Sequence, residues 1–241
     1  MAAIVGKKLG MTRVFLEDGS AVPVTVIEAA PNKVTAIRKA DRDGYDAVQL
    51  AGIPVREDRI RKPEAGHLDK AGASGMRTLV EFRDADVSVG PSKEVEAPAG
   101  GDAEKASEDS GGAAEDASSD GEAGPKVGDD VTVSSFEPGQ QVKVSAVSIG
   151  KGFQGTIKRH NFSRGPETHG SHNVRAPGSV GASADPARVF KGMRMPGQMG
   201  SRRVTQRGAH IVEVDAERNL LLIRGSVPGG KNTTVEVRSD G

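Results

Sequence analysis

The sequence of 241 residues contains no cysteine and no tryptophan, and only 3% of its residues are aromatic. Without cysteine there are no disulfides, no thiolate metal ligands and no thiol nucleophile. No apolar run approaches the ~20 residues that span a bilayer, and the apolar start of the chain is too short for a signal peptide. We therefore expect a cytoplasmic protein without a membrane partner, whose core is aliphatic rather than aromatic.

The formal net charge of zero is the sum of two opposite segments. Residues 151–207 contain eleven lysines and arginines, which only Glu167 and Asp185 oppose. Residues 94–124 contain ten aspartates and glutamates and a single cation, Lys105. Charge asymmetry of this kind carries information about partners that the average hides.

The acidic segment is composed mainly of Ala, Gly, Ser, Asp and Glu and has almost no side chain large enough to pack. Such a composition cannot offset the entropy lost on ordering. We predict that residues 94–124 form a disordered, solvated insertion. A regulatory tail and an RNA mimic are alternatives, which we favour less because like charges repel and extend a chain.

The basic segment, residues 151–207, is called the arm below. Glycine and proline interrupt it throughout, and a long cationic segment cannot bury itself because each desolvated charge needs a partner. A polyanion with its own shape, structured RNA, is the partner we predict. Cations neutralise phosphates and aromatic rings stack on bases, so Phe153, Phe162 and Phe190 are candidates for stacking. Anchoring the base of the arm to the barrel is the alternative role for any of the three. The predicted RNA contacts are Lys151, Phe153, Lys158, Arg159, His160, Phe162, Arg164, His169, Arg175, Lys191, Arg194, Arg202, Arg203 and Arg207.

Outside the two charged segments, short runs of Val, Ile and Leu predict strands, and an Asp-Gly turn predicts a hairpin. Because strands lie on both sides of the arm, we expect one antiparallel barrel or sandwich from which the arm projects as a loop. The apolar run Leu220–Ile223 predicts a strand buried on both faces. The predicted strands are 12–16, 21–27, 32–39, 45–51, 79–83, 128–136, 141–147, 209–215, 219–224 and 233–238, with a turn at 41–44 and a short helix at 64–71.

Five segments follow from these predictions. The barrel body comprises residues 1–93, 125–150 and 208–241, the acidic insertion is 94–124, and the arm is 151–207.

Two patterns suggest other chemistry. Gly225–Asn232 nearly satisfies a P-loop, but Asn232 stands where Ser or Thr would hold magnesium, and a strand pattern follows where a helix must begin. His160, His169 and His172 lack nearby carboxylate pairs and helical spacing, so we predict no metal and no cofactor. Met193, Met195 and Met199 lie among glycines and Arg194, which favours packing on nucleotides over a core.

Ordered matches along almost the whole chain suggest a family. They are Val5–Arg13, Pro23–Ile27, Lys62–His67, Gly150–Gly155, Lys158–Phe162, Thr168–Gly170, Pro177–Gly181, Val189–Gly192, Met195–Gly200, Val212–Asp215 and Asn219–Gly229. With these stretches the chain resembles bacterial ribosomal protein L-three of the large subunit.

The resemblance implies a structural protein, not an enzyme, with a β-barrel of the kind shared with translation factors. It also implies that the barrel sits on large-subunit rRNA beside neighbouring ribosomal proteins. The arm would extend through rRNA toward the peptidyl transferase centre, and the protein would act early in subunit assembly.

The chain departs from the family pattern at several positions. Lys143 stands where Asp or Asn is usual, and Ile149 where Lys is common, so the charge is moved rather than removed. Ala184 stands where many relatives carry a methylated glutamine, so that modification cannot occur. The acidic segment is an apparent insertion. We expect function to survive all of these.

Two other hypotheses remain open at the level of sequence. One is a nucleotide-dependent enzyme built on the glycine motifs, which NTP turnover would support. The other is a free-standing RNA chaperone, which absence from purified large subunits would support.

Overall fold

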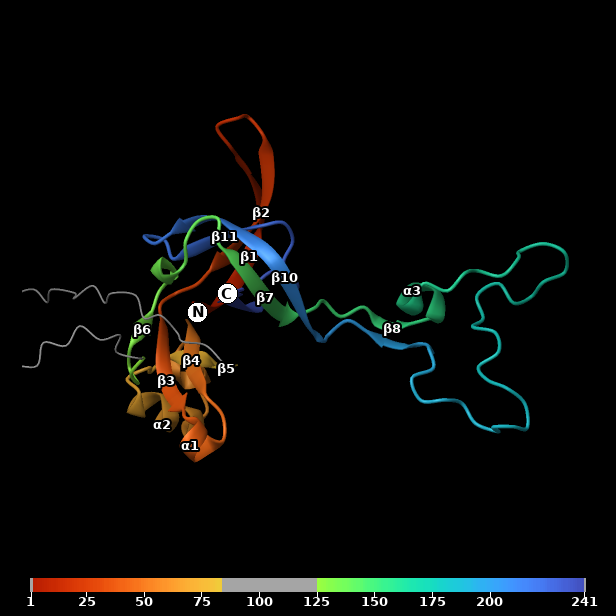
Figure 1. Ribbon diagram of the computed structural model, residues 1–241, viewed down its shortest axis with the longest axis horizontal. Coiled ribbons are helices and arrows are strands. Elements are labelled where there is room, and N and C mark those ends of the chain that lie inside the picture. The colour runs from red at the N-terminus through yellow and green to blue at the C-terminus, as the bar shows by residue number, and fades with distance from the viewer. Residues whose placement is uncertain (1, 84–124, 241) are drawn as a thin grey trace, which may run out of the picture.

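The computed structural model describes residues 2–83 and 125–240 of the chain, and the predicted acidic insertion lies outside these residues. Within them the protein is mainly β (Figure 1). The strands are β1 (Ala3–Phe15), β2 (Ala21–Glu28), β3 (Asn32–Arg38), β4 (Ala47–Pro54), β5 (Met76–Arg83), β6 (Asp130–Val131), β7 (Gln141–Val147), β8 (Gly152–Gln154), β9 (Gly197–Met199), β10 (Arg203–Asp215), β11 (Leu220–Arg224) and β12 (Thr234–Ser239). The helices are α1 (Ala40–Asp43), α2 (Lys62–Lys70) and α3 (Thr156–His160), with 3-10 turns η1 (Glu57–Arg59) and η2 (Val133–Ser135).

Six strands close an antiparallel barrel in the order β1-β12-β7-β10-β11-β2. Its core is aliphatic, with Ile4, Ile27, Ile211, Leu221 and Ile223 almost fully buried. The predicted mainly β fold with an antiparallel barrel and a projecting basic loop is confirmed (Figure 1). β7 and β10 flank the arm in sequence and pair with each other, so the arm leaves and re-enters the barrel at one place.

A second sheet, in the order β5-β4-β3-β6, lies outside the barrel and carries α1 and α2 (Figure 1). The sequence suggested one barrel or sandwich, whereas residues 32–83 pack with Ala3, Val5 and Val131 around cores separate from that of the barrel. β1 serves both cores because successive side chains of a strand point to opposite faces. Ile4 packs in the barrel, whereas Ala3 and Val5 pack against the second sheet.

Three local predictions need correction. The strand expected at 128–136 is limited to β6, and the chain then enters the 3-10 turn η2. The run Leu220–Ile223 is not buried on both faces, because Leu220 and Leu222 are only half-buried on the outside of a closed barrel. The turn expected at 41–44 is the single helical turn α1, which Gly44 ends in the left-handed conformation.

The hairpin predicted near the start of the chain is confirmed as β1 and β2, joined by the Asp-Gly turn. Leu16 donates a backbone hydrogen bond of 3.0 Å to Ser20, and Gly19 donates one of 2.9 Å to Leu16. The tip of this hairpin projects away from the barrel (Figure 1). The predicted helix at 64–71 is confirmed as α2.

Candidate nucleic-acid interface

The arm begins as an ordered two-stranded stalk. We define the stalk as residues 148–160 and 195–202, and the outer loop as residues 161–194. The backbone nitrogens of Ser148 and Lys151 donate hydrogen bonds of 2.9 Å to the carbonyl oxygens of Arg202 and Met199. Farther out, β8 pairs with β9. The stalk therefore holds the outer loop away from the barrel (Figure 1).

The two chain segments of the stalk cross very closely at Gly200. This residue has a φ of 75°, and a Cβ built on it would lie 2.1 Å from the carbonyl oxygen of Ile149. Only glycine tolerates both the left-handed conformation and so close an approach of another backbone. The glycines of the arm thus shape the stalk, in addition to any contact with phosphate.

Helix α3 packs across the end of the stalk. It ends at Asn161, whose φ of 58° is left-handed. The Arg159 Nη1 donates a hydrogen bond of 2.7 Å to the carbonyl oxygen of Met195, and the His160 Nε2 lies 3.0 Å from the same oxygen. Two of the predicted RNA contacts therefore bind the returning segment of the arm itself.

The outer loop exposes its side chains. From residue 151 to residue 202, Thr156 is the one buried residue. Ion pairs involve few of the arm's cations within the described residues: Arg164 pairs with Glu167 in the outer loop, and Arg203 pairs with Glu236 of β12. The Arg188 guanidinium lies 5.8 Å from the centre of the Phe190 ring. Most cations of the arm therefore point into solvent without a counter-ion among residues 2–83 and 125–240.

Most predicted RNA contacts are exposed, and Phe153 on β8 is 75% exposed. Phe162 is half-buried, with its ring centre 6.2 Å from that of His160. Met193 and Met195 are exposed, as expected for side chains outside a core. The exposed predicted contacts are Lys151, Phe153, Lys158, Arg164, His169, Arg175, Lys191, Arg194, Arg202, Arg203 and Arg207.

The end of the arm differs from the irregular segment that the sequence suggested. Arg203 and Arg207 lie on β10, which runs without interruption from the stalk into the barrel. Alternation of side chains along this strand is weak in the sequence because Gly208 interrupts it, and the pairing with β7 shifts register between Gln206 and Ala209.

A second group of cations was not predicted. Arg56, Arg59, Arg61 and Lys62 are exposed at η1 and the start of α2, and none forms an ion pair within the described part of the chain. Arg56 and Arg59 also line an open groove. The sequence signal was four cations within seven residues. Glu57 and Asp58 lie among them and lower the net charge of the segment, so it did not stand out as basic.

The P-loop-like segment is a connection between two barrel strands. After Asn232 the chain enters β12, so no helix follows the glycines. The ammonium of Lys8 donates hydrogen bonds to the carbonyl oxygens of Val227 and Gly229 and thereby fixes the segment to β1. The described residues contain no cluster of three or more potential metal ligands that could hold an ion. Residues 2–83 and 125–240 also contain no helix with the length and hydropathy needed to cross a membrane.

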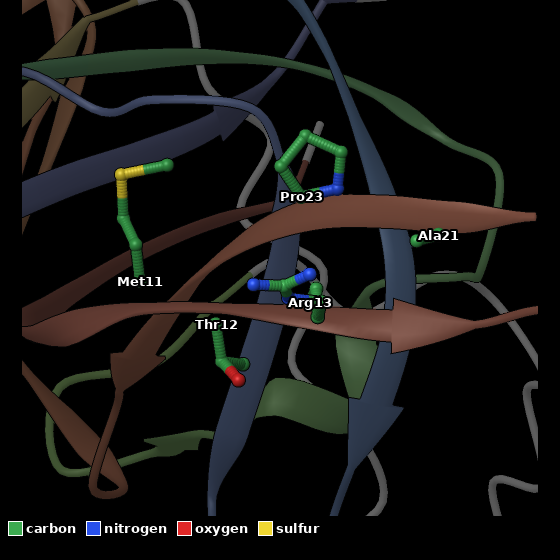
Figure 2. A pocket seen from close by; sticks show the side chains of 5 residues that line it. All are labelled: Met11, Thr12, Arg13, Ala21 and Pro23. Atoms are coloured by element: carbon green, nitrogen blue, oxygen red, sulfur yellow. The ribbon is translucent and has the colours of Figure 1, made fainter.

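An open groove of about 560 Å³ lies on the β1–β2 hairpin (Figure 2). Met11 and Thr12 point to opposite sides of β1 there, as the alternation of a strand requires (Figure 2). The other lining residues are Arg13, Ala21 and Pro23. This set contains no carboxylate, histidine or nucleophile pair, so it lacks the groups of an acid–base site.

Comparison with known proteins identifies the family of the chain. The family description "Ribosomal protein L3" matches residues 126–219. The large ribosomal subunit protein uL3 of Alkalilimnicola ehrlichii is 47% identical over 98% of this chain and 93% of the relative. Proteins of the same name from an Azoarcus species and from Halorhodospira halophila are 46% and 44% identical, and each match covers 98% of this chain and 96% of the relative. The chain therefore belongs to the large ribosomal subunit protein uL3 family, and it is a structural constituent of the ribosome in the bacterial cytoplasm and not an enzyme.

Proposed function

We propose that the protein binds large-subunit rRNA chiefly through its arm, with the stalk directing the outer loop into folded RNA. The observation that carries this proposal is the exposure of the arm's cations, most of which have no counter-ion in the described chain. Unpaired cations on an irregular backbone fit phosphates placed by the RNA fold, and release of RNA counter-ions drives such binding.

The outer loop is proposed to approach the peptidyl transferase centre, as the resemblance to the family implies. Half of the arm, fully extended at ~3.3 Å per residue, spans at most roughly 90 Å. The outer loop is longer than any other connection among the described residues, which fits a role in reaching distant RNA. The rRNA would perform the chemistry, and the arm would fix the local RNA fold.

An early role in subunit assembly follows from the same geometry. An arm that inserts between RNA helices must be in place before those helices close around it. Replacing residues 161–194 by a short Gly-Ser linker should therefore lower the yield of complete large subunits in reconstitution. Normal yield with the shortened arm would contradict the assembly role.

Directed cleavage tests where the outer loop lies. Because the chain has no cysteine, a single introduced cysteine can carry a tethered Fe-EDTA group without competition. Ser183→Cys in the outer loop should cleave rRNA at the peptidyl transferase centre within assembled subunits. Ser20→Cys, at the tip of the β1–β2 hairpin, is the matched control and should cleave elsewhere. Identical patterns, or no cleavage from position 183, would refute the proposed placement.

A salt titration tests the mode of binding. The logarithm of the rRNA affinity should fall with the logarithm of salt concentration, by about 0.7 to 0.9 per neutralised phosphate. A flat titration would refute binding through the cations of the arm.

A further inference from the structure

The stalk contains a contact whose purpose the charge of the arm does not explain. Arg159 and His160 both reach the carbonyl oxygen of Met195, at 2.7 Å and 3.0 Å. A residue whose task is only to neutralise phosphate has no reason to be held by its own chain. The neighbouring Lys158 is exposed and makes no such contact within the described residues.

We propose that Arg159 and His160 are positioning residues that form a clamp on Met195 and so pre-shape the arm before RNA binds. The inference deepens, and rests on, the proposed binding of rRNA by the arm. It reassigns two side chains that sequence alone grouped with the phosphate contacts.

The position of the clamp supports this role. Moving out from the barrel, the two segments of the stalk are joined by the hydrogen bonds of Ser148, then by β8 and β9, and finally by the clamp. Beyond Met195 and His160 the outer loop begins. The clamp is therefore the outermost link, and it fixes the direction in which both ends of the outer loop leave the stalk.

The clamp also depends on a glycine. A Cβ built on Gly197 would lie 2.6 Å from the Arg159 Nη1 and 3.2 Å from its Cζ, so the guanidinium occupies the space that a side chain would take. Gly197 does not have a left-handed φ, and its backbone pairs with Gln154 in the ribbon of β8 and β9. Alanine would thus keep the strand but push the flexible end of Arg159 away from Met195.

Preorganisation is the physical benefit. A free arm must lose conformational freedom when RNA orders it, and every contact made beforehand reduces that cost. The Arg159 contact of the clamp is a charge-assisted hydrogen bond, and it should improve rRNA affinity by about five- to tenfold through preorganisation alone. This gain does not involve a phosphate, so it leaves the salt dependence unchanged.

Gly197→Ala in the full-length protein is the decisive variant, because it displaces Arg159 without changing any charge. In the free protein, amide hydrogen exchange in a peptide covering residues 156–162 should become faster. rRNA affinity should fall by about five- to tenfold with the salt slope unchanged. In an Arg159→Ala background, Gly197→Ala should add almost nothing, because the two changes break one contact.

Gly10→Ala, on β1, is the matched control. Gly10 has no left-handed φ, and nothing lies within 4 Å of an added Cβ. Exchange over residues 156–162 should therefore stay as in the unchanged protein. Lys158→Ala provides the opposite pattern, with unchanged exchange and a salt slope reduced by about 0.7 to 0.9.

Two results would overturn the clamp. The first is amide exchange over residues 156–162 that is the same in Gly197→Ala as in the unchanged protein. The second is a salt slope that Arg159→Ala reduces as much as Lys158→Ala does, together with an rRNA affinity that Gly197→Ala leaves unchanged. If the unchanged protein showed no salt-dependent binding to rRNA, the proposed function would fail instead. The exchange comparison in the free protein would then still decide the clamp.

Discussion

The ammonium of Lys8 in β1 donates a hydrogen bond of 2.7 Å to the carbonyl oxygen of Val227, a residue 219 positions farther along the chain. The same group donates to Gly229 at 3.0 Å, and Lys8 is 9% exposed. A buried cation normally has a carboxylate partner, but here backbone carbonyls take that place. Lys8 thus holds the connection between β11 and β12 in place on the barrel.

Lys8→Met should destabilise the protein by about 2 kcal/mol, because it leaves two carbonyl oxygens without a donor. Burial lowers the pKa of Lys8 from its ordinary value of 10.5. As the pH approaches 10.5, the unfolded chain therefore binds more protons than the folded protein does. The difference in unfolding free energy between the unchanged protein and Lys8→Met should grow in that range. Chemical denaturation at several pH values measures both effects.

Lys7→Met is the control for this experiment. Lys7 is half-buried on the opposite face of the same strand. Its replacement should change the free energy of unfolding by less than about 0.5 kcal/mol. Equal losses at the two positions would show that the contacts of Lys8 do not matter.

Gly52 in β4 lies so close to Asn32 and Val5 that its position has no room for a side chain. A Cβ built on it would lie 2.6 Å from the Asn32 Oδ1 and 3.1 Å from the Val5 Cβ, and the Asn32 Nδ2 already donates to the Val5 carbonyl oxygen. Gly52→Ala should therefore cost about 1–3 kcal/mol, because these neighbours are buried and cannot move freely. Thermal unfolding measures this loss.

Gly66 provides the contrast for Gly52. It lies inside α2, and nothing is within 4 Å of an added Cβ. Gly66→Ala should stabilise the protein by about 0.5–1 kcal/mol, because alanine favours the helix. A stabilising effect at position 52 would contradict the packing described for β1.

Much of the fold was predictable from local patterns. The Asp-Gly turn and its flanking runs predicted β2 and the last residues of β1, but not its start at Ala3. The pattern at 141–147 predicted β7 to the residue. The separation into two sheets was not predictable. The separation arises because both faces of β1 are apolar. Consecutive apolar residues such as Ile4 and Val5 do not indicate in the sequence which of the two cores each side chain enters.

The arm shows the same limit for the candidate site. Charge alone singled out the arm as the predicted RNA-binding segment, because net charge needs no knowledge of contacts. The roles of Arg159 and His160 depend on Met195, which lies 35 residues or more away, and on the space left by Gly197. Such long-range pairs leave no trace in composition or periodicity.

Phe153 separates binding from stability. Its ring is 75% exposed on β8, so it contributes little to the core. Phe153→Ala should change the melting temperature by less than ~1 °C. It should weaken rRNA binding by about 1–3 kcal/mol if the ring stacks on a base. Unchanged affinity would remove Phe153 from the interface, and a large loss of stability would show a packing role.

Glu236 of β12 offers a test of electrostatics at the base of the arm. Burial raises the pKa of its carboxyl group above the ordinary 4.5, although Arg203 and Arg238 act in the opposite direction. The folded protein therefore holds this proton more tightly than the unfolded chain. The stabilisation that this bound proton contributes is complete below pH 4.5. It is lost as the pH rises through the pKa that Glu236 has in the folded protein.

Glu236→Gln should consequently raise the melting temperature at neutral pH by about 2 °C, because the amide avoids the cost of a half-desolvated charge. The difference should disappear below pH 4.5, where the carboxyl group of the unchanged protein is also neutral. Glu213→Gln, on the exposed face of β10, is the control and should change the melting temperature at neutral pH by less than about 1 °C. A lower melting temperature for Glu236→Gln at neutral pH would mean that the ion pair with Arg203 outweighs desolvation, and that this pair anchors the arm to the barrel.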